Sequence, residues 1–241
     1  MSRTRILVLA ATVGVVALIA GALTPAADAA SSKPVVGHCY NLSYAQAGGA
    51  SSTAPYVACS STHTTKTFAV LTVPSGTDYK NITDAQQIKL GVTLCQPQFG
   101  KILGSTPENR HLTAYDFLFF IPTAAQRAAG ARWLRCDVYL AGGKANLPLP
   151  SNTTPLLQGP ITDKIKRCLV GTDHLFTTCD HNHQYRSSAA YTLSGTGYRT
   201  PAQFTAACVQ HCPDAEYFTW PSKLRWGVGD HVLVCYDKTN A

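Results

Sequence analysis

The chain has 241 residues and a formal net charge of +7, with 14% charged residues, nine cysteines and a single methionine. This length suits one large domain or two small ones. The positive residues are scattered, and the densest group, Lys164, Lys166 and Arg167, is far smaller than the basic stripe that nucleic acid binding needs. Composition and charge therefore argue against a nucleic-acid-binding protein.

The N-terminal residues have the pattern of an export signal. A basic start precedes an uncharged apolar run over residues 6–23, and Ala27 and Ala29 are the small residues that a signal peptidase accepts. We expect cleavage before Ala30, so that residues 1–29 form a signal peptide that contacts the membrane only during export. The alternative is an uncleaved anchor, because the run reaches the lower limit of a membrane-spanning length. The remaining chain is predicted to be secreted or associated with the cell envelope.

The rest of the sequence contains an internal repeat. In each half a histidine follows a cysteine by four residues, and a glycine and a cysteine follow a proline by eight and fourteen residues. The matching residues are Cys59, His63, Pro122, Gly130 and Cys136 in the first half, and Cys179, His183, Pro221, Gly229 and Cys235 in the second. Two frames in register indicate a duplication.

The repeat divides the chain into two modules. The first spans residues 35–140 and the second residues 161–238, and residues 141–160 between them are rich in proline and glycine. Such a composition is typical of a linker. We expect short strands at the opening cysteine, through the Cys-x-x-x-His segment and at the closing cysteine of each module.

One helix is expected in each module, over residues 84–99 and 200–212. Thr83 and Thr200 can cap these helices, and Pro201 suits a first turn. The predicted fold class is therefore α+β, with two small tandem modules stapled by disulfides, each a short antiparallel sheet with one packed helix.

Export makes disulfide bonds the expected state of the cysteines. Cys212 is the residue without a counterpart, and it lies four residues after Cys208, so on a helix both face the same way and either could pair with Cys235. The remaining thiol is left free or joins two chains. Proximity along the chain favours the pairs Cys39–Cys59, Cys95–Cys136, Cys168–Cys179 and Cys208–Cys235.

Zinc is the alternative use of these side chains. The second half holds enough nitrogen and sulfur ligands for a tetrahedral site, namely Cys179, His181, His183, Cys208, His211 and Cys212. The first half has only Cys59, His63 and Cys95 in the matching positions, without the short-spaced cysteine pair of a zinc knuckle. We therefore predict no metal site and no cofactor.

His63 and His183 are polar residues repeated in register, and each could act as a general base or as a ligand. The commoner role of such a histidine is to tie down a turn after a disulfide, which we favour. In the second half Asp180 and Asp230 each have a histidine neighbour, but no serine or reduced cysteine stands in a nucleophile motif beside them. We assign no catalytic residue.

Trp226 has no counterpart in the first module, where Arg127 holds the same place. It could mark a contact patch together with Trp220, as a structural or binding residue. The alternative, which we favour, packs both tryptophans under the closing strand.

The frame resembles a known family. Gly37-His38-Cys39, then Cys59 with His63, and finally Pro221, Trp226, Gly229 and Cys235 resemble the actinobacterial exported modules of the septum formation family. That family opens with Gly-Asp-Cys, continues with Val-Pro-Cys-x-x-x-His, and closes with Pro, Trp, Gly and Cys. The resemblance implies an envelope-associated, non-catalytic domain with a link to division septa, and it supplies no catalytic residues.

The leading hypothesis is an exported tandem module that acts by binding or by structural presence in the cell envelope. A diffuse positive charge favours an anionic cell-wall polymer as partner, beside an unknown envelope protein. The rival hypothesis is a hydrolase or transferase of envelope polymers that uses a His/Asp pair in the second module.

Overall fold

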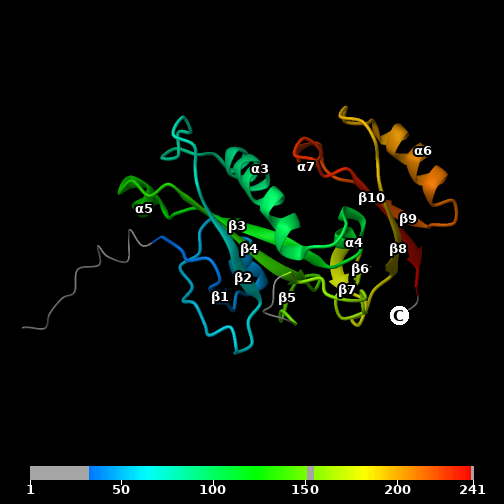
Figure 1. Cartoon of the computed structure of the whole chain (residues 1–241), viewed down its shortest axis with the longest axis horizontal. Coiled ribbons are helices and arrows are strands. Elements are labelled where there is room, and N and C mark those ends of the chain that lie inside the picture. Colours follow the sequence, from blue (N-terminus) through cyan, green and yellow to red (C-terminus); the bar gives the residue numbers. More distant parts are fainter. Residues whose placement is uncertain (1–32, 151–154, 240–241) are drawn as a thin grey trace, which may run out of the picture.

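The computed structural model describes residues 33–150 and 155–239, so the predicted signal peptide lies outside the described residues. The chain forms two antiparallel sheets with helices between their strands (Figure 1). The first module contains β1 (Cys39–Tyr40), α2 (Tyr44–Ala47), β2 (Thr65–Thr72), α3 (Asp84–Leu103), α4 (Pro107–His111), β3 (Tyr115–Phe120), α5 (Ala124–Ala128), β4 (Trp133–Ala141) and β5 (Asn146–Leu147). The second contains β6 (Arg167–Val170), β7 (Leu175–Thr178), β8 (Tyr185–Thr192), α6 (Pro201–His211), β9 (Tyr217–Thr219), α7 (Lys223–Trp226) and β10 (Val232–Lys238).

The two sheets share one strand order. The first runs β1-β2-β4-β3 and the second β6-β8-β10-β9, and all neighbouring strands are antiparallel. Each sheet adds one strand of its own: β5 pairs with the end of β4, inside the range expected as a linker, and β7 pairs with β6. The predicted fold class is confirmed, and the shared order supports the duplication.

The long helices begin where their caps predict. Thr83 and Thr200 each accept a hydrogen bond from the backbone N–H three residues later, and the glutamine at that position bonds back to the cap. Each pair forms a capping box, which satisfies two N–H groups that the first turn leaves without partners. α6 closely matches its expected range, whereas α3 continues to Leu103 through Pro97.

α3 lies very close to the first sheet. A Cβ atom added at Gly91 would stand 2.3 Å from the ring of Phe119 on β3, so only glycine permits this approach. Beyond this point Phe99 and Leu103 pack into a core with Leu134 and Val138 of β4. In the second module Phe204 of α6, Trp226 and Leu233 form the corresponding core.

The structure pairs the sulfurs as Cys39–Cys59, Cys95–Cys136, Cys168–Cys179 and Cys212–Cys235. The first three pairs are those favoured from the sequence. In the fourth, Cys212 replaces the expected Cys208, which is free and buried. Counted from the capping threonine, Cys95 and Cys212 both stand twelve residues along, whereas Cys208 matches Gly91. The bridge therefore follows the helix register and not the distance along the chain.

Burial settles the fate of the remaining thiol. Cys208 is fully buried in the second core, and burial raises the pKa of its thiol to about 12. A buried, protonated thiol is a poor nucleophile and is not accessible to a second chain in the folded state.

The two modules are joined by backbone pairing. The N–H of Ala114 donates to Ile165 O at 2.8 Å, and the N–H of Arg167 donates to Leu112 O at 2.8 Å. α4 packs between α3 of the first module and strands β8 and β10 of the second, as Figure 1 shows. This joint sets the two modules side by side. Within the described residues, no helix is long and apolar enough to cross a membrane.

Candidate functional site: a cleft between the modules

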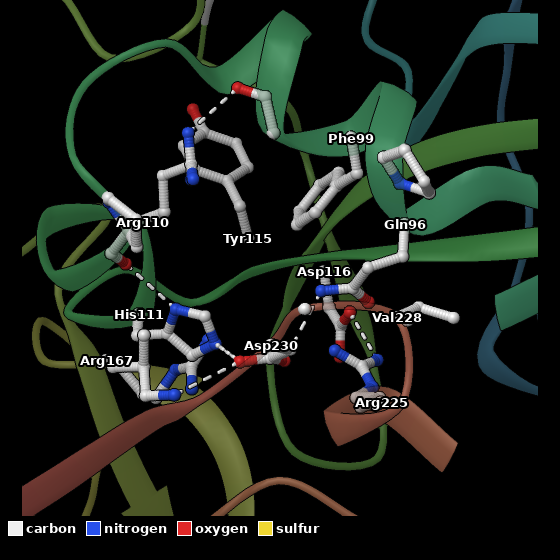
Figure 2. A pocket seen from close by; sticks show the side chains of 15 residues that line it. Gln96, Phe99, Arg110, His111, Tyr115, Asp116, Arg167, Arg225, Val228 and Asp230 are labelled. Atoms are coloured by element: carbon white, nitrogen blue, oxygen red, sulfur yellow. Dashed lines mark hydrogen bonds and ion pairs between the residues drawn. The ribbon is translucent and has the colours of Figure 1, made fainter. Parts of the chain in front are cut away.

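A cavity of about 190 Å³ lies where the modules meet (Figure 2). α3, α4 and β3 line it from the first module, and β6, α7 and the loop before β10 line it from the second. A second cavity of about 240 Å³ shares part of this lining. The shared residues are His111, Asp116, Arg167, Arg225, Asp230 and Val232. The two cavities therefore form one cleft around a charged cluster.

Asp230 is the centre of this cluster. Its Oδ1 lies 3.0 Å from Nε2 of His111, and its Oδ2 accepts a hydrogen bond from Nε2 of Gln96 at 3.3 Å. Figure 2 shows both side chains reaching the carboxylate, from α4 and α3 respectively. Nδ1 of His111 faces the carbonyl oxygen of Pro107 at 2.9 Å, so both ring nitrogens face acceptors.

The carboxyl group of Asp230 is held in its charged form. Burial is the largest effect and favours the neutral acid, but the hydrogen bond and charge of His111, the charge of Arg225 and the N–H of Val232 together outweigh it. The pKa of Asp230 therefore lies below its ordinary value.

A second ion pair crosses the joint. Nη2 of Arg225 on α7 lies 2.9 Å from Oδ1 of Asp116 on β3, and the guanidinium carbon lies 5.0 Å from the ring centroid of Phe117. The charge of Asp116 raises the pKa of Arg225 despite the opposing effect of burial. This contact fixes α7 of the second module against the first sheet.

Two further arginines line the cleft, and their hydrogen-bond partners are neutral backbone carbonyls. Arg110 donates from Nη1 to the carbonyl oxygens of Gly100 and Ser105, at 3.2 Å each. Arg167 donates from Nε to Thr113 O at 2.8 Å, and its guanidinium carbon lies 4.2 Å from the ring centroid of Phe176. Burial lowers the pKa of Arg110, against the raising effect of Asp230 and Glu108.

The repeated histidines lie outside this cleft. His63 and His183 are 3% and 4% exposed, and Nδ1 of each bonds to the carbonyl oxygen two residues earlier, at 2.8 Å and 2.7 Å. This is the geometry expected of a histidine that stabilises a turn. Neither ring lines the described cleft.

Trp226 is packed in the second core. It is 2% exposed, its Nε1 donates to Thr196 O at 3.0 Å, and its ring meets Phe204 edge-on at 5.6 Å. Trp220 stacks on Phe204 at 5.0 Å and also lines the second cavity. The geometry places Trp226 as a packing residue.

The residues considered for zinc do not converge in the described structure. Cys168, Cys179 and His183 place their ligand atoms within 4.8 Å of one another, but the two sulfurs form a disulfide with each other. His181 lies on an exposed turn and bonds to Asp180 at 2.9 Å. The sulfur of Cys212 is used by Cys235.

Sequence reasoning missed most of the cleft. Of its charged residues, Asp230 was noticed only as a neighbour of His231, and Arg167 only within a basic group. His111, Asp116 and Gln96 carried no signal, because they belong to no motif and their partners in the second module are far away along the chain. Arg110 belongs to no motif either. The adjacent pair Arg110-His111 at the end of a capped helix is the one local hint that the sequence offers.

Two antiparallel sheets that share a core strand order, each carrying two disulfides and joined around a charged cleft, define a class of small proteins suited to an oxidising compartment. The model of the family described as septum formation matches residues 36–235. The chain belongs to the septum formation family, and the match covers both modules. No curated protein and no solved structure matches the chain significantly. Family and disulfides together fit an extracellular or envelope protein.

Proposed function

We propose that this chain is an exported, non-catalytic protein of the actinobacterial cell envelope, which acts in septum formation by binding through the cleft between its modules. Family membership supports the septum-related role, and the disulfides support a location outside the cytoplasm. The observation that carries the binding role is the cleft itself, where charged side chains of both modules are held in place by contacts across the joint.

The lining of the cleft supports binding over catalysis. Among the described residues around the first cavity, the only hydroxyl belongs to Tyr115, whose pKa burial raises to about 12. Ser222 and Thr219 line the adjoining cavity. The Oγ of Ser222 accepts a hydrogen bond from the N–H of Arg225 and caps α7, and Oγ1 of Thr219 is hydrogen-bonded with the hydroxyl of Tyr236 at 3.3 Å. None of these groups is an activated nucleophile.

One observation favours a rival enzyme. His111 and Asp230 form an imidazole–carboxylate pair inside a cleft, which is an arrangement that general bases use. The pair joins the two modules, whereas the rival hypothesis placed it in the second module alone. A hydrolase would use His111 to activate water and would cleave a bound polymer, whereas a binding protein would leave the polymer intact.

The test is sedimentation of the purified mature chain with isolated cell-envelope fragments, followed by mass spectrometry of the supernatant. We expect the protein to sediment with the fragments and to release no soluble products. His181→Gln is the matched control for His111→Gln, because His181 also pairs with an aspartate but lies outside the cleft. Product release that His111→Gln abolishes and His181→Gln retains would establish the enzyme. Failure to sediment would contradict the binding role.

A further inference from the structure

We propose that the cleft binds a carboxylate that carries a neighbouring hydrogen-bond donor, as at the carboxyl end of a peptide, with Arg110, Arg167 and Gln96 as its contacts. This inference deepens the proposed function and rests on it, since it names the chemical class of the ligand. It follows from the charges, the unsatisfied groups and the size of the cleft.

The charges of the cleft are unbalanced. Arg110, Arg167 and Arg225 line it against only two carboxylates, those of Asp116 and Asp230. Asp116 is paired with Arg225, and Asp230 receives His111 and Gln96. One net positive charge remains even with a neutral His111.

The excess charge lies on Arg110 and Arg167. Neither makes an ion pair within 4.0 Å in the described part of the chain, where each donates to backbone carbonyls instead. Arg167 is only 6% exposed. Burying a guanidinium without a counter-charge is unfavourable, so an anion that enters the cleft regains part of that cost. Arginine suits this role because its planar fork bonds both oxygens of a carboxylate.

The second signal is an acceptor without a donor. Nε2 of Gln96 bonds to Asp230, but Oε1 of the same amide is buried and has no hydrogen-bond partner in the described structure. A buried acceptor left unpaired costs about 1–3 kcal/mol. Figure 2 shows the Gln96 amide at the cavity, beside Asp230. A ligand with an N–H or O–H next to its charge would satisfy this oxygen.

A carboxylate fits better than a phosphate. With a neutral His111, a carboxylate cancels the one net charge of the cleft, whereas a phosphate monoester, which carries about −1.5 to −2 at neutral pH, would leave the cleft negative. A phosphodiester carries one charge, but the linkage itself has no N–H or O–H donor. An N-acylated amino acid places an amide N–H one carbon away from the carboxylate, and the cavity of about 190 Å³ accepts such a terminal group.

The experiment is an NMR titration of the oxidised mature chain with N-acetylalanine. The probes for comparison are its methyl ester, which lacks the charge, propionate, which lacks the donor, and glycerol 3-phosphate. We expect saturable shifts of cleft amides with N-acetylalanine, and an affinity about tenfold or more above each of the others, as the loss of one buried polar contact predicts. Equal binding of the ester, or tighter binding of glycerol 3-phosphate, would overturn the proposal.

Two variants separate the contacts. Arg110→Gln should weaken N-acetylalanine about tenfold or more, and Gln96→Met should remove the preference over propionate. Arg132→Gln is the matched control, because Arg132 also donates to backbone carbonyls but lies away from the cleft. Circular dichroism checks that each variant is folded. An equal loss of N-acetylalanine affinity in Arg132→Gln would refute the site. If the protein sediments with the envelope fragments but does not bind N-acetylalanine, this inference is refuted and the proposed function is not.

Discussion

At the scale of single residues, the cysteine pairing shows how a local register decides a covalent bond. Cys208 lies in the last turn of α6 and Cys212 is the residue that caps its C-terminal end, but only Cys212 shares the position of Cys95 counted from the capping threonine. The position of Cys208 corresponds to that of Gly91, where α3 lies directly against the ring of Phe119. The unpaired thiol therefore fills a packing position.

The pairing is tested by removing each thiol in turn. Cys212→Ala should lower the free energy of unfolding by about 2–4 kcal/mol, because it removes the constraint that the bridge places on the unfolded chain. Cys208→Ala should leave the bridge intact. Non-reducing peptide maps and denaturant unfolding measure both. Recovery of a Cys208–Cys235 peptide from the wild-type chain would contradict the assignment.

Gly91 gives a second prediction at this scale. Gly91→Ala would gain about 1 kcal/mol of helix propensity, but the new Cβ would overlap the ring of Phe119 near its attachment. Overpacking of this kind costs about 1–3 kcal/mol, so we expect a net loss of stability in thermal unfolding. Gly76→Ala is the control, because a Cβ there meets nothing within 4 Å. A more stable Gly91→Ala variant would show that α3 is not held at this distance.

At the scale of elements, the two modules repeat their local devices. Each long helix starts with a threonine capping box, and each short helix before the closing strand ends in a turn with a left-handed glycine. Gly130 and Gly229 have φ values of 93° and 90°. The glycines recur at one spacing because this turn needs a conformation that other residues adopt only with strain.

Substitution of these glycines tests the turn. Gly130→Ala and Gly229→Ala should each lower the free energy of unfolding by about 1–2 kcal/mol, which is the cost of a left-handed conformation with a Cβ. No neighbouring atom lies within 4 Å of the added Cβ at either site, so the change in unfolding free energy reflects backbone strain and not a steric clash. Chemical denaturation of both variants measures it. A neutral effect at both sites would mean that the turn relaxes.

At the scale of the whole molecule, the cleft holds the modules together through charge. Asp116–Arg225 and His111–Asp230 each join a residue of the first module to one of the second. The backbone pairing of residues 112–114 with residues 165–167 brings these side chains within reach. The joint between the modules should therefore weaken in acid.

Asp230 makes this prediction specific. Its pKa is lowered in the folded protein, so its charged form stabilises the fold above the unfolded value of about 3.9, and this contribution is lost as the pH falls through the lower folded pKa. Asp230→Asn should therefore be less stable than the wild type at pH 7, and the difference should shrink below about pH 4. Urea unfolding across this pH range measures it. Asp173 is exposed, so the free energy of unfolding of Asp173→Asn should have the same pH dependence as that of the wild type. If Asp230→Asn also has the pH dependence of the wild type, the argument is contradicted.

Sequence alone determined the local and repeated features of this protein. The Cys-x-x-x-His and Pro–Gly–Cys frames, the caps at Thr83 and Thr200, three of the four disulfides and the family all follow from patterns in the sequence. Caps and turns depend on residues close together in the chain, and the three predicted bridges join cysteines that follow one another in the order of cysteines, which is why they can be predicted from it.

Only the tertiary structure revealed the cleft, and it showed which sequence register governs the fourth bridge. Cys208 and Cys212 lie so close in sequence that distance along the chain does not choose between them, and the bridge forms at the residue that shares the position of Cys95. His111 and Asp230 meet because backbone pairing joins the modules at one place, and no local pattern encodes that joint. Contacts between distant segments are set by the packing of whole elements, and so the site became visible only when both modules were in place.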